Sequence, residues 1–176
     1  TVSSTLSKHG IEKTAATVRE AFRYILIILI PTVFFISATS TPVIDLIYGS
    51  DYLAGSGTLS ILVFGIGLVI FTGQIVMVLN AIGKPTFTIL VAVAMMITHL
   101  ATGFLLLPLG LEGIAYSFVI SSVVGLLAAI AYASKKLGSV LNIKSSAKIF
   151  LVVLPLFFAL KTLTISNPYM LFGSLF

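Results

Sequence analysis

Residues 58–83 read TLSILVFGIGLVIFTGQIVMVLNAIG and carry no charged side chain. An α-helix needs about 20 mainly apolar residues to cross the hydrocarbon core of a bilayer, so this run is long enough to span one. Residues 85–111 and 113–134 are likewise free of Asp, Glu, Lys and Arg. These three runs predict an all-α fold, specifically a polytopic transmembrane helical bundle.

The composition agrees with a membrane protein. Hydrophobic residues make up 59% of the chain and charged residues 9%, whereas a soluble domain has about 25% charged residues. The absence of cysteine excludes disulfides and thiolate metal sites. The net charge of +5 comes from basic residues in the connections between apolar runs, which indicates membrane topology. We expect the lipid bilayer, and no nucleic acid, as a partner.

The apolar runs divide the chain into a cytoplasmic amphipathic segment, residues 1–21, and a transmembrane bundle, residues 22–176. Pro31 is expected to kink the first span. The links 83–85 and 108–110 are short, so consecutive helices are expected to be antiparallel neighbours. The expected spans are 22–47, 58–82, 85–107, 113–133 and 147–164, followed by a truncated span from 169.

Charge predicts the orientation of these spans. If each span crosses once, every Lys and Arg except Lys161 lies on the side of the N-terminal segment. Asp45, Asp51 and Glu112 lie on the other side. Because Lys and Arg collect in cytoplasmic loops, we expect a multi-pass protein of the cell membrane with its N-terminal segment in the cytoplasm.

His99 is the first candidate functional residue, because it is the only titratable group deep within an expected span. An ionisable side chain inside a membrane suggests function by default, and histidine suits proton coupling or a hydrogen bond to a sugar or pyrophosphate. A neutral ring bonded to Thr98, Thr102 or a neighbouring helix is the simpler explanation, and we favour it.

Four further residues are candidates for substrate contact. Gln74 and Asn80 either line a cavity or join helices by hydrogen bonds, and the position of Asn80 near a span end favours the second role. Arg19 and Arg23 lie at the cytoplasmic mouth of the first span, where an arginine fork suits phosphate oxygens. Topology and attraction to anionic lipids explain the two arginines as well.

No enzyme motif is present. The sequence has no Gly-x-x-x-x-Gly-Lys-Ser/Thr phosphate loop, no His-Glu-x-x-His metal motif and no paired carboxylates within a span. We therefore expect no enzymatic activity, no cofactor and no metal site. Small residues at helical spacing, Ser117, Ser121, Ser122 and Gly125, predict close helix packing.

Four motifs follow one another in an order typical of one transporter family. They are PVIDLIYGSDY at 42–52, LSIL at 59–62, LNAIGKP at 79–85 and LPLGLEGIA at 107–115. In this order they resemble the C-terminal half of polysaccharide flippases of the multidrug/oligosaccharidyl-lipid/polysaccharide transporter superfamily. Residues 57–165 are similar to the C-terminal domain of polysaccharide biosynthesis proteins. His99 and Gly103 stand where that family often carries asparagines.

The resemblance implies most of one six-helix lobe of a MATE-like, two-lobe transporter that alternates access to a central cavity. The implied activity is flipping of polyprenyl-linked oligosaccharide for cell-envelope polysaccharide biosynthesis, with H⁺ or Na⁺ as coupling ion. Thr1 is not an initiator methionine and Phe176 ends an apolar stretch, so we expect a piece of a longer chain whose N-terminal lobe is missing.

Three alternatives stay open. A multidrug or cation antiporter of the same superfamily would be expected to carry an acidic residue within a span for ion exchange. The chain also fits a non-transporting membrane scaffold or fragment. As a part of a membrane transferase it would need acidic residues for metal or base chemistry, and its five acidic residues are scattered.

Overall fold

The computed structural model describes the backbone of residues 2–137, 151, 153–155, 157–159 and 161–162, with side chains from residue 15 to 136 and beyond 150. Every regular element within this part of the chain is helical, which confirms the all-α prediction. The elements are α1 (Val2–Ala38), α2 (Ser40–Tyr48), η1 (Ser50–Gly55), α3 (Ser56–Ala81), α4 (Thr86–Leu106), η2 (Leu107–Leu109) and α5 (Gly110–Leu137).

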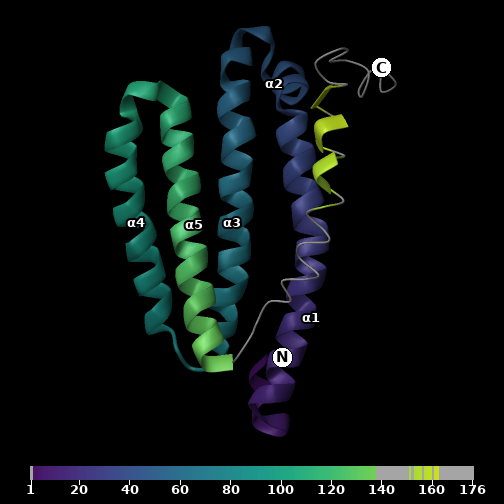
Figure 1. Cartoon of the computed structure of the whole chain (residues 1–176), viewed down its shortest axis with the longest axis vertical. Coiled ribbons are helices and arrows are strands. Elements are labelled where there is room, and N and C mark those ends of the chain that lie inside the picture. The colour runs from purple at the N-terminus through teal and green to yellow at the C-terminus, as the bar shows by residue number, and fades with distance from the viewer. Residues whose placement is uncertain (1, 138–150, 152, 156, 160, 163–176) are drawn as a thin grey trace.

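The four long helices stand side by side and alternate in direction, in the order α4, α5, α3, α1 across the bundle (Figure 1). The short link between α3 and α4 joins antiparallel helices, as expected. The two are not close neighbours along their length, however, because α5 packs between them. The expectation that consecutive helices are neighbours is therefore correct for α4 and α5 and wrong for α3 and α4.

Three continuous helical segments of the described chain are long and apolar enough to cross a membrane, namely Ala15–Ala38, Ser50–Ala81 and Thr86–Lys136. The third segment folds back on itself at η2, so it consists of the antiparallel pair α4 and α5 (Figure 1). With 21 and 28 residues, each arm exceeds about 30 Å at 1.5 Å per residue. The bundle thus contains four helices of membrane-crossing length.

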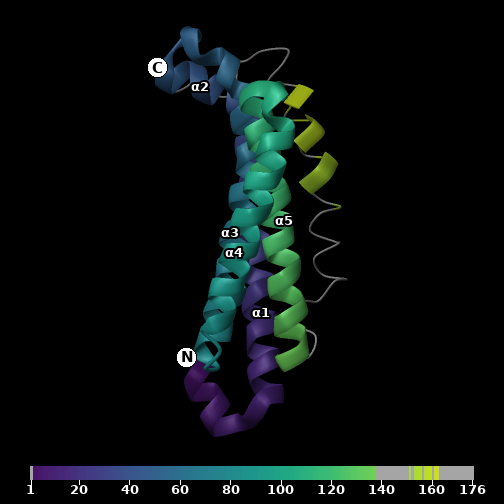
Figure 2. The ribbon, with the colours of Figure 1, turned by 90° about the vertical axis from the view of Figure 1, so that its left-hand side faces the viewer.

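The expected first span, 22–47, is divided in the structure. Helix α1 ends at Ala38, and the short helix α2 then projects from the end of the bundle (Figure 2). Pro42 lacks the N–H that would bond the Ala38 carbonyl, and a proline ring clashes with the carbonyl four residues earlier. The break falls at Thr39, whose backbone N–H and hydroxyl both donate to the Phe35 carbonyl, at 3.0 and 2.8 Å. In contrast, α1 continues as a helix through Pro31.

Glycines with positive φ end or begin three of the helices. Gly49, Gly83 and Gly110 have φ values of 88°, 78° and 65°. At the end of α3 the Lys84 N–H donates to the Leu79 carbonyl and the Gly83 N–H to the Asn80 carbonyl, both at 3.0 Å. This pair of bonds is the Schellman motif, which favours glycine because L side chains are strained at positive φ.

The N-terminal and C-terminal parts of the chain can be compared with the expected segment boundaries. α1 is continuous from Val2, so the expected boundary between residues 21 and 22 falls inside a helix, and Ala15 and Val18 are buried in the bundle core. The described residues of the expected span 147–164 are helical, and Val153 packs against Ile30 and Phe34 of α1. The rest of that span, and the expected span from 169, lie outside the described residues.

Candidate functional site

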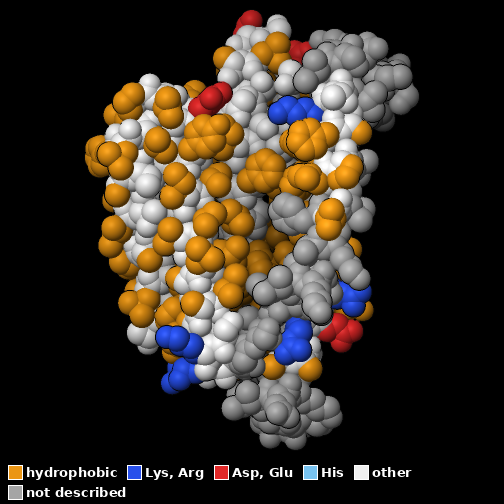
Figure 3. Space-filling model, viewed as in Figure 1, with side chains coloured by type: hydrophobic (Ala, Val, Ile, Leu, Met, Phe, Trp, Pro, Cys, Tyr) orange, Lys and Arg blue, Asp and Glu red, His pale blue; other side chains and the backbone are white. Residues whose placement is uncertain are grey.

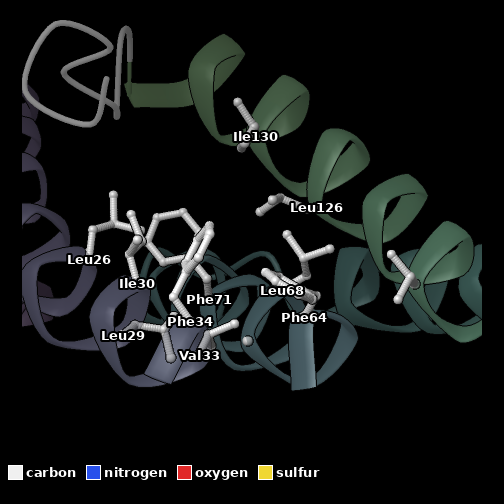
Figure 4. Close-up of a pocket in the computed structure, with 12 residues that line it drawn as sticks. Leu26, Leu29, Ile30, Val33, Phe34, Phe64, Leu68, Phe71, Leu126 and Ile130 are labelled. Atoms are coloured by element: carbon white, nitrogen blue, oxygen red, sulfur yellow. The ribbon is translucent and has the colours of Figure 1, made fainter. Parts of the chain in front are cut away.

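An apolar groove lies between α1, α3 and α5, with a volume of about 500 Å³. Side chains from the three helices point into a common space (Figure 4). No charged or hydrogen-bonding side chain is among the described residues that line the groove. They are Leu26, Leu29, Ile30, Val33, Phe34, Phe64, Gly67, Leu68, Phe71, Val119, Leu126 and Ile130.

The groove lies at mid-height of the bundle. On either side of it along the bundle axis, side chains of α1 and α3 are in direct contact. Toward one end, Phe22 packs edge-to-face on Phe71, with ring centroids 5.4 Å apart, within the main core cluster. Toward the other end, the hydroxyls of Ser37 and Ser60 lie 2.8 Å apart. Between these contacts the two helices present bulky aliphatic and aromatic side chains, which leave space between α1 and α5.

None of the residues predicted from the sequence lines this groove. The groove residues are ordinary apolar residues, and nothing in the sequence distinguishes them from lipid-facing ones. Phe34 illustrates the difficulty: it is buried and lines the groove, whereas the adjacent Phe35 is 47% exposed. Only the relative rotation of three helices separates the two positions.

His99 lies on α4 and faces α5. Its Nδ1 is 3.1 Å from the Ser117 hydroxyl oxygen, and its ring meets Phe118 edge-on, with centroids 6.0 Å apart. Gly103, one turn further along α4, also faces Ser117, since a Cβ on Gly103 would lie 3.7 Å from that hydroxyl. Thr98 and Thr102 donate to carbonyls of their own helix. The partner of His99 is therefore on the neighbouring helix.

The two amide candidates differ in their contacts. The Thr88 hydroxyl donates to Oδ1 of Asn80 at 2.7 Å, so Asn80 ties the end of α3 to the first turn of α4. Gln74 is half-buried in α3, and its side-chain amide takes part in no hydrogen bond among the described residues. Asn80 thus has the joining role that its position predicted, and the role of Gln74 stays a prediction.

Arg19 and Arg23 are exposed on α1. Their part of α1 lies at the end of the bundle where α3 is linked to α4 and where α5 ends with Lys135 and Lys136 (Figure 1). Most of the basic side chains in the surface view gather at this end (Figure 3). Asp45, Asp51 and Glu112 belong to elements at the opposite end (Figure 1). Neither arginine lines the groove, and their contact with substrate stays a prediction.

The stripe of small residues on α5 is closely packed, as predicted. Ser117, Ser121 and Ser122 are 0–2% exposed, and each hydroxyl donates to a carbonyl of its own helix. Met95 of α4 occupies the space where Gly125 would carry a Cβ. Among the described residues, no three His, Cys, Asp or Glu side chains are grouped as a metal site would require.

Comparison with known proteins leaves the family of this chain open. No protein-family model, no curated protein and no solved structure matches it. The helical bundle and the groove are therefore the firm findings, and any function assigned to them is a proposal from chemistry and from the motif resemblance.

Proposed function

We propose that this chain forms one lobe of a membrane transporter that flips polyprenyl-linked oligosaccharide across the cell membrane for surface polysaccharide biosynthesis. The observation that carries the proposal is the apolar groove between α1, α3 and α5. A polyprenyl chain has no hydrogen-bonding groups, so walls without polar side chains suit it. A saccharide in the same groove would leave its hydroxyls unpaired, at a cost of several kcal/mol.

The motif glycines support the same proposal. Gly49, Gly83 and Gly110 belong to three of the motifs that resemble flippases, and each has a positive φ at a helix end. Three glycines of the motifs therefore lie at positions where the backbone turns.

The charge distribution supports an orientation with the N-terminal side in the cytoplasm. The start of α4, the end of α5 and the N-terminal part of α1 lie at the same end of the bundle (Figure 1), and most basic side chains in the surface view gather there (Figure 3). Lys and Arg favour the cytoplasmic side of membrane proteins. In this orientation the groove is at mid-membrane, and the polyprenyl chain would enter it from the lipid.

A cation antiporter is the second candidate, and the observed charges favour it less. No Asp or Glu occurs in α3 or α4, and Glu112 of α5 lies in its first turn. An antiporter would need a carboxylate at depth, supplied by another part of the protein. A scaffold without transport would leave the groove without a ligand.

The groove can be tested with a matched pair of variants in the complete protein. Leu126 lines the groove, whereas the adjacent Leu127 is 61% exposed on the outside of α5. Leu126→Gln should slow flipping of a fluorescent polyprenyl-diphosphate oligosaccharide in proteoliposomes about tenfold, since burial of one leucine contributes about 1.5–3 kcal/mol. Leu127→Gln should flip at the parental rate.

Equal rates for the two variants would remove the groove from the mechanism. A deletion strain gives an independent test, because loss of a flippase should leave lipid-linked oligosaccharide on the cytoplasmic leaflet. Normal surface polysaccharide in that strain would overturn the proposed substrate. Export of a cationic dye driven by a proton gradient, without flipping, would favour the antiporter.

A further inference from the structure

The hydrogen bonds of Ser117 determine which nitrogen of His99 carries a proton. The Ser117 oxygen is 2.7 Å from the Ile114 carbonyl and 3.1 Å from Nδ1 of His99. A hydroxyl has one proton to donate, and a carbonyl can only accept. The shorter bond therefore takes the hydroxyl proton, and the Ser117 oxygen is left to accept from an N–H at Nδ1.

A neutral imidazole has a single N–H, so Nε2 of His99 then carries a lone pair. His99 has no hydrogen bond beyond the one to Ser117, and no buried side-chain nitrogen or oxygen of the described residues lacks a partner. Nε2 is consequently at the accessible surface of the half-buried ring. Among the described elements, α4 packs mainly against α5.

The depth of His99 places this lone pair inside the membrane. The residue lies seven positions before the last residue of α4, Leu106, which corresponds to about 10 Å along the helix axis. Water is scarce at that depth, so a basic nitrogen with an open lone pair is an unusual group there. Intramembrane histidines of this kind act in proton relays or at substrate sites.

Few charged groups face His99 from the helices around it. α4 has no Asp, Glu, Lys or Arg over its length, and neither has α3. α5 carries Glu112 in its first turn, five residues before Ser117, and Lys135 and Lys136 at its far end. A proton bound at Nε2 would thus find no carboxylate beside it in the described bundle, and its N–H would need an acceptor from outside.

We propose that Ser117 holds His99 in the Nδ1–H tautomer and so makes the accessible Nε2 a proton-binding site within the α4–α5 hairpin. The reaction is a single proton transfer: Nε2 takes a proton, Nδ1 keeps its bond to Ser117, and the ring becomes an imidazolium. Ser117 is a positioning residue, since it acts through the orientation and tautomer of the ring. This proposal does not depend on the flippase activity, because it concerns the chain without substrate.

Nitrogen NMR of histidine can test the proposal in the complete protein. With ¹⁵N-labelled histidine in lipid bilayers, the difference between the parental and His99→Gln spectra isolates the His99 ring. In the neutral form Nδ1 should give the signal of a protonated nitrogen and Nε2 that of an unprotonated one. Acidification should move the Nε2 signal to the protonated position and leave Nδ1 nearly unchanged.

Two serine variants separate positioning from packing. Ser117→Ala removes the acceptor of the Nδ1 proton, so the ring should shift toward the Nε2–H tautomer. Ser121→Ala removes an equally buried hydroxyl of the same helix that bonds only the Phe118 carbonyl, and it should leave the tautomer unchanged. An Nε2–H tautomer in the parental protein would overturn the proposal. So would an unchanged tautomer in Ser117→Ala.

Loss of proton binding and loss of flipping remain distinguishable. If the NMR result holds and His99→Gln flips substrate normally, the proton site stands and has no part in transport. If the tautomer is wrong and the Leu126→Gln effect is present, the flippase proposal stands and the proton site falls.

Discussion

Toward α4, the helix α5 presents serine and glycine, whereas toward α1 it presents Val119, Leu126 and Ile130. The first side is closed, with serines that are almost fully buried and Met95 seated over Gly125. The second side opens into a groove of about 500 Å³. Small residues allow helix backbones to approach closely within a membrane. Bulky side chains keep α1 and α5 apart, and the space between these two helices is not completely filled.

The largest expected effect comes from placing the same large side chain on each side. Ser121→Phe has no room for its ring in the closed interface, and overpacking of this kind costs about 3 kcal/mol. Leu126→Phe points into the groove and should change the free energy of unfolding by less than about 1 kcal/mol. Denaturant titration in mixed detergent micelles would measure both. Equal destabilisation would mean that the groove is not open space.

A smaller change tests the close contact of α3 with α5. A Cβ on Gly65 would lie 2.5 Å from Cδ1 of Phe118, whereas a Cβ on Gly73 would meet no atom within 4 Å. Gly65→Ala should therefore be less stable than Gly73→Ala by about 1–3 kcal/mol. The same denaturant titration applies, and Gly73→Ala serves as the matched control for helix propensity. Identical stabilities would show that Phe118 moves aside freely.

The smallest effect is expected at the turn between α3 and α4. Thr88→Val keeps the side-chain shape and removes the hydrogen bond to Asn80. Interhelical hydrogen bonds in membrane proteins contribute about 0.6 kcal/mol, and the loss should be of that size. The control is Thr86→Val, which changes an exposed threonine of the same turn. If Thr86→Val were the more destabilising, the bond would have no net contribution.

Helix positions were predictable wherever an uncharged run ends in glycine or proline. The expected span 58–82 corresponds to α3, Ser56–Ala81, and 85–107 to α4, Thr86–Leu106. The first span was predicted less well. Pro31 was expected to kink it, and α1 continues as a helix through Pro31. The break, which was not predicted, lies at Thr39, where Pro42 leaves the Ala38 carbonyl without its usual partner. Both prolines lack a backbone N–H, yet the helix continues through Pro31 and breaks shortly before Pro42.

For the candidate residues too, the sequence predicts some features and leaves others undetermined. The place of His99 deep in an apolar helix follows from the sequence, but its partner does not, since Ser117 is 18 residues away on another helix. The joining role of Asn80 was easier to predict, because its partner Thr88 lies only eight residues further along the chain, across a short turn. The groove could not be predicted at all, because its walls are leucine, isoleucine, valine and phenylalanine, like much of the lipid-facing surface.

By itself, the sequence determined that this is an all-α chain with helices able to cross a membrane, because backbone groups in hydrocarbon must bond within their own helix. It also determined the turns, since positive φ at Gly83 and Gly110 requires residues without a Cβ. Only the tertiary structure decided that α5 lies between α3 and α4, that a groove opens toward α1, and that His99 meets Ser117. Those features depend on how helices rotate and approach, and in a uniformly apolar chain that depends on the fit of side-chain shapes, which hydropathy does not record.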